Sequence, residues 1–165
     1  MSTKSNILKQ FRIILCETSH AGNIGSVARA MKTMGFSNLY LVNPKDFPSK
    51  HAQALACGAE DILQKTIVVT SLEKALKNIN HVVGFTTRKR ELTQPHKNVR
   101  KLSKQLFNEA KNNKIALIFG NEIYGVSKEG IQSAKECVEI NQHGIKKSMN
   151  VSVAAGITLW KIKNK

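Results

Sequence analysis

Short apolar runs rich in β-branched residues alternate with helix-like segments along this chain. Two of the runs, RIILC and IALIF, are apolar almost throughout and lack the alternation of apolar and polar residues that marks a half-exposed strand. Such runs are typical of strands that helices cover on both faces of a parallel sheet. The sequence therefore predicts an α/β fold with a mostly parallel sheet, helices on both faces, and strands at residues 12–16, 39–42, 67–69, 82–85, 115–119 and 138–140.

The length of the chain limits the number of domains. With 165 residues, of which 41% are hydrophobic, the chain suits one globular domain with a single core. We predict a single domain over residues 1–165, with a flexible N-terminal segment over residues 1–10. No run reaches the roughly 18 apolar residues of a membrane span, and the N-terminus lacks the apolar core of a signal peptide. We therefore expect a cytoplasmic protein without a membrane partner.

The strongest compositional bias is positive charge. Lys and Arg number 26 against 11 Asp and Glu, which gives a formal net charge of +15. A surface of this kind attracts a polyanion, and nucleic acid fits better than a membrane. Over the basic stretch 88–104 we predict RNA phosphate contacts by Arg88, Lys89, Arg90, Lys97, Arg100, Lys101 and Lys104. A solvated basic face without a ligand explains the same residues equally well.

The sequence contains no pattern of metal ligands. Its three cysteines lack C-x-x-C spacing, and we predict that all three are reduced and buried. The five histidines are scattered without i, i+4 pairing, so no metal site is expected. His20 lies close to Asn23, and we favour a polar loop residue over a catalytic one at that position.

A helix is expected over residues 24–34, after the first strand. Its apolar positions form one stripe at helical spacing, made of Ile24, Val27, Ala28, Met31 and Met34. Arg29 points away from that stripe, toward solvent or a cleft. Asn23 faces the same way only if it lies outside the helix as an N-cap or loop residue. The alternative is an ordinary N-cap Asn and a solvated Arg. Further along, Thr70 and Glu73 match a capping box that predicts another helix start.

Three segments combine polar residues and glycine where a strand should lead into a helix. They read ETSHAGNIGSVAR (17–29), FGNEIYG (119–125) and SMNVSVAAG (148–156). In open α/β sheets, ligands bind beyond the carboxyl ends of the strands, where these segments are expected to lie. The sequence has neither the G-x-G-x-x-G motif of dinucleotide-binding folds nor a Walker-type G-K-[ST], so a phosphate cradle is not expected.

In this order the three segments resemble the three motifs of the SPOUT superfamily of RNA methyltransferases, most closely its SpoU/TrmH family. The stretch ETSHAGNIGSVARAMKTMG is similar almost letter for letter to the catalytic domain of TrmJ-type tRNA 2'-O-methyltransferases. The resemblance implies a SPOUT fold with a C-terminal trefoil knot and a homodimer. It also implies transfer of a methyl group from S-adenosyl-L-methionine to a ribose 2'-hydroxyl, with a pyrimidine of the tRNA anticodon loop as the favoured target.

The resemblance also implies the site residues. The positions that match catalytic motif positions are Asn23, Arg29, Glu122, Ser148 and Asn150. Arg29 would contact RNA and promote deprotonation of the 2'-hydroxyl, and Asn150 would orient Arg29. The positions that match the methyl-donor pocket are Phe85, Thr86, Thr87, Gly120, Asn121, Ile140, Lys147, Ser148 and Met149.

The sequence departs from the TrmJ-type pattern at three positions, since Lys146 and Lys147 replace a usual Tyr-Ser pair and Met149 replaces a common Leu. The alternatives to the favoured activity are methylation of another tRNA site or of rRNA, and a noncatalytic basic RNA-binding protein with the same fold. The last helix is apolar nearly all round, with Val153, Ile157 and Trp160 opposite its other apolar face. It suits either a central helix within one subunit or the interface of a homodimer.

Overall fold

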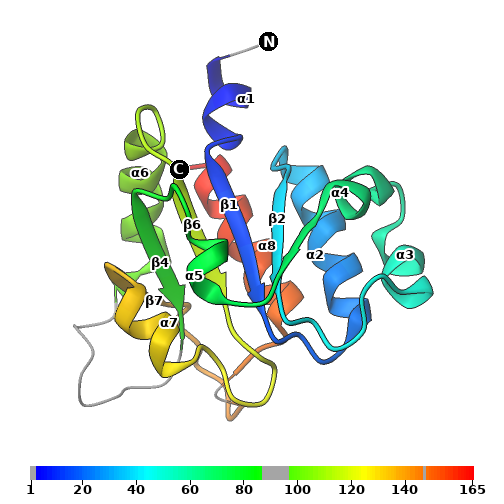
Figure 1. Ribbon diagram of the computed structural model, residues 1–165. Helices are drawn as coiled ribbons and strands as arrows, with labels where there is room; N and C mark the ends of the chain where they lie inside the picture. Colours follow the sequence, from blue (N-terminus) through cyan, green and yellow to red (C-terminus); the bar gives the residue numbers. More distant parts are fainter. Residues whose placement is uncertain (1–2, 87–96, 147) are drawn as a thin grey trace.

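The computed structural model describes residues 3–86, 97–146 and 148–165, which form a seven-stranded sheet with parallel pairing throughout (Figure 1). The order across the sheet is β3-β2-β1-β6-β4-β7-β5. The strands are β1 (Phe11–Cys16), β2 (Asn38–Val42), β3 (Ile67–Val69), β4 (His81–Phe85), β5 (Lys97–Asn98), β6 (Ile115–Phe119) and β7 (Glu136–Glu139). The predicted α/β class and mostly parallel sheet are confirmed.

Helices cover both faces of this sheet. They are α1 (Thr3–Leu8), α2 (Ala21–Met34), α3 (Lys50–Ala56), α4 (Glu60–Lys65), α5 (Leu72–Ala75), α6 (Val99–Glu109), α7 (Lys128–Ser133) and α8 (Val151–Lys163). Helices α2, α6 and α8 pack against alternate strand residues such as Ile13 and Leu117, behind the sheet in Figure 1. Helices α5 and α7 lie in front, against residues such as Ile14 and Ile118. Because successive strand residues point to opposite faces, β6 contributes to both cores and all its residues are buried.

The boundaries of β7 differ from the prediction because a charged residue is buried in that strand. Glu136 is 7% exposed, and its Oε2 lies 3.0 Å from Nε2 of the buried His81, although the two atoms are not aligned as a hydrogen bond. Its other oxygen pairs with Lys97 of β5. A search for apolar runs passes over a strand that starts with glutamate. It also passes over β5, since both of its residues are polar.

Two local expectations differ from the structure. Residues 3–8, expected to belong to a flexible N-terminus, form α1, and Ile7 and Leu8 of this helix are buried. Helix α5 begins one residue later than the capping box predicts, because Ser71 and not Thr70 supplies the capping oxygen, which accepts a hydrogen bond from the first turn. Both differences arise from side-chain burial or hydrogen bonding that the local pattern leaves open.

Helix α2 approaches α3 closely. A Cβ atom added at Gly25 would collide with the backbone of Ala52 in α3, so the contact requires glycine at this position. The first turn of α2 follows β1 and lies beside the carboxyl end of that strand (Figure 1). The carboxyl ends of the central strands and the N-terminal ends of α2 and α8 lie on one side of the molecule (Figure 1).

Candidate functional site

A cavity of about 590 Å³ opens at the carboxyl ends of β4, β6 and β7, beside the first residues of α8. Its apolar wall includes Phe85 and Phe119, whose rings stack with centroids 4.6 Å apart. Ile140 and Met149 extend this wall, while Asn121, Gln142 and Ser148 are among its polar residues. A mostly apolar cleft with a few polar groups is the usual form of a small-molecule site.

A chain of hydrogen bonds joins three distant segments beside this cavity. Glu122 Oε1 accepts from Asn23 Nδ2 at 2.9 Å, and Asn23 Oδ1 accepts from Asn150 Nδ2 at 2.9 Å. Glu122 Oε2 accepts from both the backbone N–H and the hydroxyl of Ser19, at 3.0 Å and 2.8 Å. Each of the three segments that combine polar residues with glycine thus contributes at least one member of the chain.

The environment of Glu122 keeps its carboxyl group ionised. Partial burial works against the charged form, but hydrogen bonds from Ser19 and Asn23 outweigh it and lower the pKa of Glu122 to about 2. At neutral pH the carboxylate is therefore charged, and both of its oxygens already accept hydrogen bonds. Through these contacts Glu122 holds Ser19 and Asn23 in place.

Asn150 has two structural tasks. Its Oδ1 accepts from the backbone N–H of Ser152 at 2.8 Å, which caps the N-terminus of α8. Its Nδ2 is the group that reaches Asn23. The start of α8 and the first turn of α2 are therefore held together by one side chain.

The turn after β6 is equally constrained. Asn121 Nδ2 donates to the carbonyl of Glu17 at 2.7 Å, and the backbone of Asn121 pairs with that of Gly125 in both directions. A Cβ added at Gly120 would collide with the backbone of Gly125 and Val126, so the turn can close only over glycine. This packing sets the position of Glu122 at the edge of the cavity.

Most of the predicted site residues are brought together. The cavity is lined by Asn23, Phe85, Thr86, Gly120, Asn121, Glu122, Ile140, Ser148, Met149 and Asn150. Arg29 is exposed on α2 and is not among the lining residues. Five further predicted residues lie outside the described residues: Thr87, Arg88, Lys89, Arg90 and Lys147.

One expectation about the catalytic group requires correction. Asn23 lies within the first turn of α2 and does not precede it, because the helix already starts at Ala21, with His20 in the capping position. Asn150 donates a hydrogen bond to Asn23, and its expected role in orienting Arg29 stays a prediction. Asn23 thus faces the cavity from inside the helix, and the geometry links Asn150 to Asn23 directly.

Sequence reasoning missed several residues of the cavity wall. The missed residues are His20, Phe119, Ile123, Gly125, Val138, Gln142, Lys146, Val151 and Ala154. Phe119 and Val138 lie in strands, where an apolar residue is expected for the core alone. Gln142 could have been predicted from Ile140, because residues two positions apart in an extended segment point the same way. Both residues line the cavity.

Four of the predicted RNA contacts are in the described part of the chain, and all are exposed at β5 or on α6: Lys97, Arg100, Lys101 and Lys104. Lys97 and Lys101 line a second cavity of about 470 Å³, which Glu139 and Asn141 also line. The segment after β7 separates the two cavities, since Ile140 faces the first cavity and Asn141 the second. The ion pair between Lys97 and Glu136 offsets part of the positive charge there.

Within the described residues, no group of three His, Cys, Asp or Glu side chains could hold a metal ion. In that same part of the chain, no helix has the length and apolar character needed to cross a membrane. All three cysteines are free, and burial raises the pKa of Cys16 to about 12. Cys137 is buried as predicted and Cys16 is half-buried, whereas the prediction for Cys57 is wrong, because this residue is exposed at the end of α3.

Comparisons with known proteins agree with this geometry. A profile of the SpoU rRNA methylase family matches residues 10–160. The tRNA (cytidine/uridine-2'-O-)-methyltransferase TrmJ of Photorhabdus laumondii is 40% identical over 157 residues, or 95% of this chain. The chain spans 65% of the length of that relative.

Solved structures share the fold. A probable methylase family protein from Haemophilus influenzae Rd KW20 is 35% identical with a TM-score of 0.88, over 95% of this chain and 66% of that one. The SpoU methyltransferase AviRb from Streptomyces viridochromogenes, solved in complex with the cofactor AdoMet, is 18% identical with a TM-score of 0.76, over 94% of this chain and 58% of that one. The match over residues 10–160, together with the shared fold, establishes that the chain belongs to the SpoU rRNA methylase family.

Proposed function

We propose that this chain is an S-adenosyl-L-methionine-dependent methyltransferase that modifies a ribose 2'-hydroxyl of tRNA, with a pyrimidine of the anticodon loop as its preferred target. The name of the TrmJ relative describes this reaction on cytidine and uridine. The observation that carries the proposal is the hydrogen-bonded chain of Glu122, Asn23 and Asn150, which joins the three family motifs at one cavity. Such a protein works in the cytoplasm, where tRNA is processed.

The cavity fits the proposed methyl donor. Phe85, Ile140 and Met149 offer apolar surface for an adenine ring, and Thr86 and Ser148 offer polar groups at the same wall. The donor supplies an electrophilic methyl group on a sulfonium, which is an excellent leaving group. The task left to the protein is to position a 2'-hydroxyl and to favour loss of its proton.

Arg29 is the residue we assign to that task. A guanidinium stays protonated, so its contribution is to stabilise the negative charge that develops on the ribose oxygen. Arg29 is exposed on the same helix as Asn23, so RNA can reach it. In this proposal Glu122 and Asn150 act through Asn23, because their contacts fix the first turn of the helix that presents Arg29.

We also propose a homodimer that forms through α8. The helix buries Val151, Ala155, Leu159 and Ile162 against its own subunit. On the opposite side it exposes Val153 (51%), Ile157 (39%) and Trp160 (51%). A second copy would cover this apolar face. Sedimentation of the wild type and of Ile157→Asp tests the interface, since loss of the dimer is expected for the variant. We also propose that the chain forms the trefoil knot that the family resemblance implies.

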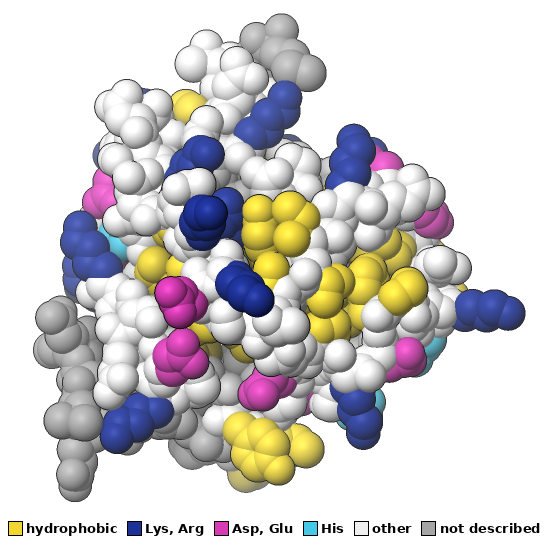
Figure 2. All heavy atoms as spheres, in the orientation of Figure 1, with side chains coloured by type: hydrophobic (Ala, Val, Ile, Leu, Met, Phe, Trp, Pro, Cys, Tyr) yellow, Lys and Arg dark blue, Asp and Glu magenta, His cyan; other side chains and the backbone are white. Residues whose placement is uncertain are grey.

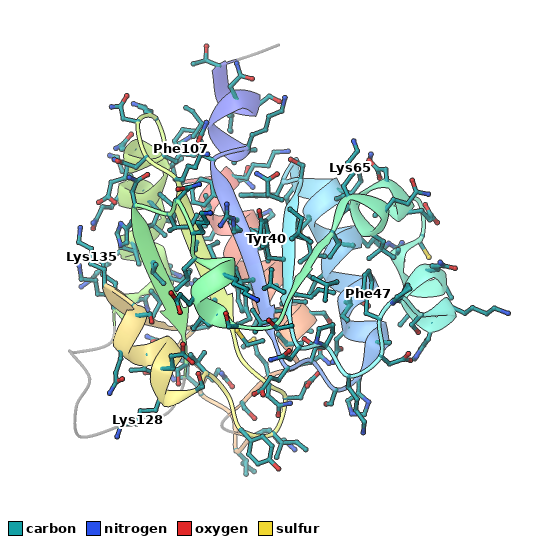
Figure 3. The ribbon with its side chains drawn as sticks, viewed as in Figure 1. Tyr40, Phe47, Lys65, Phe107, Lys128 and Lys135 are labelled. Carbon is teal, nitrogen blue, oxygen red and sulfur yellow. The ribbon has the colours of Figure 1, made fainter. Side chains whose placement is uncertain are left out.

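We assign RNA binding to the basic residues at the start of α6. Lys101 and Lys104 are the best positions to test. Lys97 is less suitable, because it also forms an ion pair with the buried Glu136. Filter binding of tRNA at two salt concentrations should give a steep salt dependence, and each Lys→Ala change should lower the slope by about 1. Lys65 on α4, on the other side of the molecule in Figure 3, is the matched control. Equal slopes for all variants would refute this assignment.

Cofactor binding tests the pocket separately from RNA. Calorimetric titration with S-adenosyl-L-methionine should show one site per chain. Absence of binding would remove the proposed reaction and favour the noncatalytic RNA-binding alternative.

A further inference from the structure

The turn between β6 and α7 holds two large apolar side chains in solvent. Ile123 is 66% exposed and Tyr124 is 67% exposed. Figure 2 shows an apolar protrusion at the lower edge of the molecule, and residues of the loops after β6 and β7 line the same cavity. Ile145, in the loop after β7, is fully exposed as well. Two large apolar side chains exposed at adjacent positions, Ile123 and Tyr124, indicate a contact surface.

This turn is held in a fixed conformation. Asn121 Oδ1 accepts from the backbone N–H groups of Ile123 and Tyr124, at 2.8 Å and 3.1 Å. The same side chain is anchored through its Nδ2 to the carbonyl of Glu17. Both apolar residues are therefore presented on backbone that is already ordered, so a ligand that binds them does not bear the entropic cost of ordering the turn.

The exposed pair is continuous with the cavity described above. Ile123 itself lines that cavity, and the next residue, Tyr124, is exposed. A nucleotide whose 2'-hydroxyl reaches the cavity carries its base only one sugar ring away. The base of that nucleotide, or of its neighbour, would then reach the turn.

We propose that Tyr124, supported by Ile123, is a stacking platform for an unpaired nucleobase of the RNA substrate. This inference rests on the proposed function and adds the substrate feature that the site recognises, a base exposed in single-stranded RNA. Unstacked bases of RNA loops are commonly bound on aromatic side chains. The net charge of +15 brings RNA to the surface, and the aromatic ring gives a base a place to stack.

A second copy of the chain fits the turn less well. A stable protein interface buries about 800 Å² on each partner, which is far more than two or three side chains provide. The exposed face of α8, with Val153, Ile157 and Trp160, offers a broader surface for a subunit.

The first test compares Tyr124→Ala with Tyr124→Phe in methyl transfer to unmodified tRNA. The Ala variant should raise the KM for tRNA by about 5-fold to about 100-fold, with kcat at saturating tRNA and the affinity for S-adenosyl-L-methionine close to wild type. The Phe variant should retain the wild-type KM, because the ring face stacks and the hydroxyl is not needed. Ile67→Ala, at an exposed position in the edge strand β3, is the control. An unchanged KM for Tyr124→Ala would overturn the proposal. Loss of the dimer by Tyr124→Ala in sedimentation would also overturn it, because the turn would then be a subunit contact.

The second test observes stacking without turnover. Tyr124→Trp adds a second tryptophan to a chain whose natural one is Trp160, so the wild type gives the background fluorescence. A single-stranded RNA oligonucleotide should quench the added fluorescence, and a duplex of the same sequence should not. Equal quenching by both, or none by either, would contradict the platform. If the wild type methylates no RNA while this selective quenching is seen, the proposed function fails and the platform stands. If the wild type methylates tRNA and Tyr124→Ala keeps the wild-type KM, the stacking platform fails and the proposed function stands.

Discussion

Asn150 donates a hydrogen bond of 2.9 Å to Asn23, across 127 positions of sequence. The bond connects the start of the last long helix to the first turn of α2, and Asn23 passes the connection on to Glu122. Because all three side chains line one cavity, the shape of that cavity depends on contacts between segments from the beginning, middle and end of the chain.

Replacing Asn150 should therefore affect the cavity beyond the loss of a helix cap. Asn150→Ala removes the cap of α8 and is expected to lower the free energy of unfolding by about 1 kcal/mol. Asn98→Ala removes the equivalent Asn cap of α6 and should cost about the same. Calorimetry should then show weakened S-adenosyl-L-methionine binding for Asn150→Ala only. Equal binding by both variants would mean that the link to Asn23 does not shape the pocket.

Glu122→Gln should destabilise the protein in a pH-dependent manner. At neutral pH the variant loses charge-assisted hydrogen bonds from Ser19 and Asn23, at a cost of about 1–2 kcal/mol after solvent screening. The pKa of this carboxyl falls from 4.5 to about 2 in the folded state, so its contribution is complete above pH 4.5 and is lost as pH falls toward 2. Urea unfolding at several pH values should show the two proteins converging over that range.

The control for this experiment is Glu73→Gln, which removes one negative charge at an exposed position of α5. Its stability should differ little from the wild type at any pH. A difference between wild type and Glu122→Gln that stays constant from pH 7 to pH 2 would show that the charge of Glu122 is not what holds the network.

Gly120→Ala should disturb the turn that carries Glu122. The added methyl group meets the backbone of Gly125 and Val126, which cannot move aside as a side chain would, so we expect a loss of at least about 1–3 kcal/mol. Gly156→Ala on α8 is the matched control, because an added Cβ there meets no atom within 4 Å. Its higher helix propensity should stabilise the protein by up to about 1 kcal/mol. Thermal unfolding of both variants measures the contrast, which a stable Gly120→Ala protein would refute.

Arg29→Lys tests the proposed electrostatic role of Arg29. The substitution keeps the charge but loses the planar fork of donors, so turnover should fall by roughly 100-fold while tRNA affinity changes little. Lys32→Ala is the control on the same helix, since its exposed ion pair with Asp61 contributes little. Single-turnover kinetics with saturating tRNA separates the two effects. Unchanged turnover would remove Arg29 from the mechanism.

The sheet was largely predictable because its strands are apolar runs. The strand at residues 67–69 matches β3, and IALIF forms β6 with all its residues buried. β7 was displaced because Glu136 is a buried charge, whose partners His81 and Lys97 come from other strands. A pattern along one segment carries no information about such partners.

The sequence indicated which residues would line the cavity, but not how they would be arranged. Motif resemblance identified Asn23, Glu122 and Asn150, and the cavity contains all of them. Their hydrogen bonds depend on where α2 begins, and Asn23 lies inside the helix because Ala21 and Gly22 extend it toward the strand. The exposed position of Tyr124 likewise follows from the Asn121 turn, a three-dimensional feature.

The most direct test of the account is a methyl-transfer assay with labelled S-adenosyl-L-methionine and unmodified bulk tRNA, followed by digestion to nucleosides. The wild type should yield label in 2'-O-methylcytidine or 2'-O-methyluridine, and Asn23→Ala should yield little, because it breaks the link between Glu122 and Asn150. Label on a base, or no label in any nucleoside although the cofactor binds, would contradict the proposed reaction.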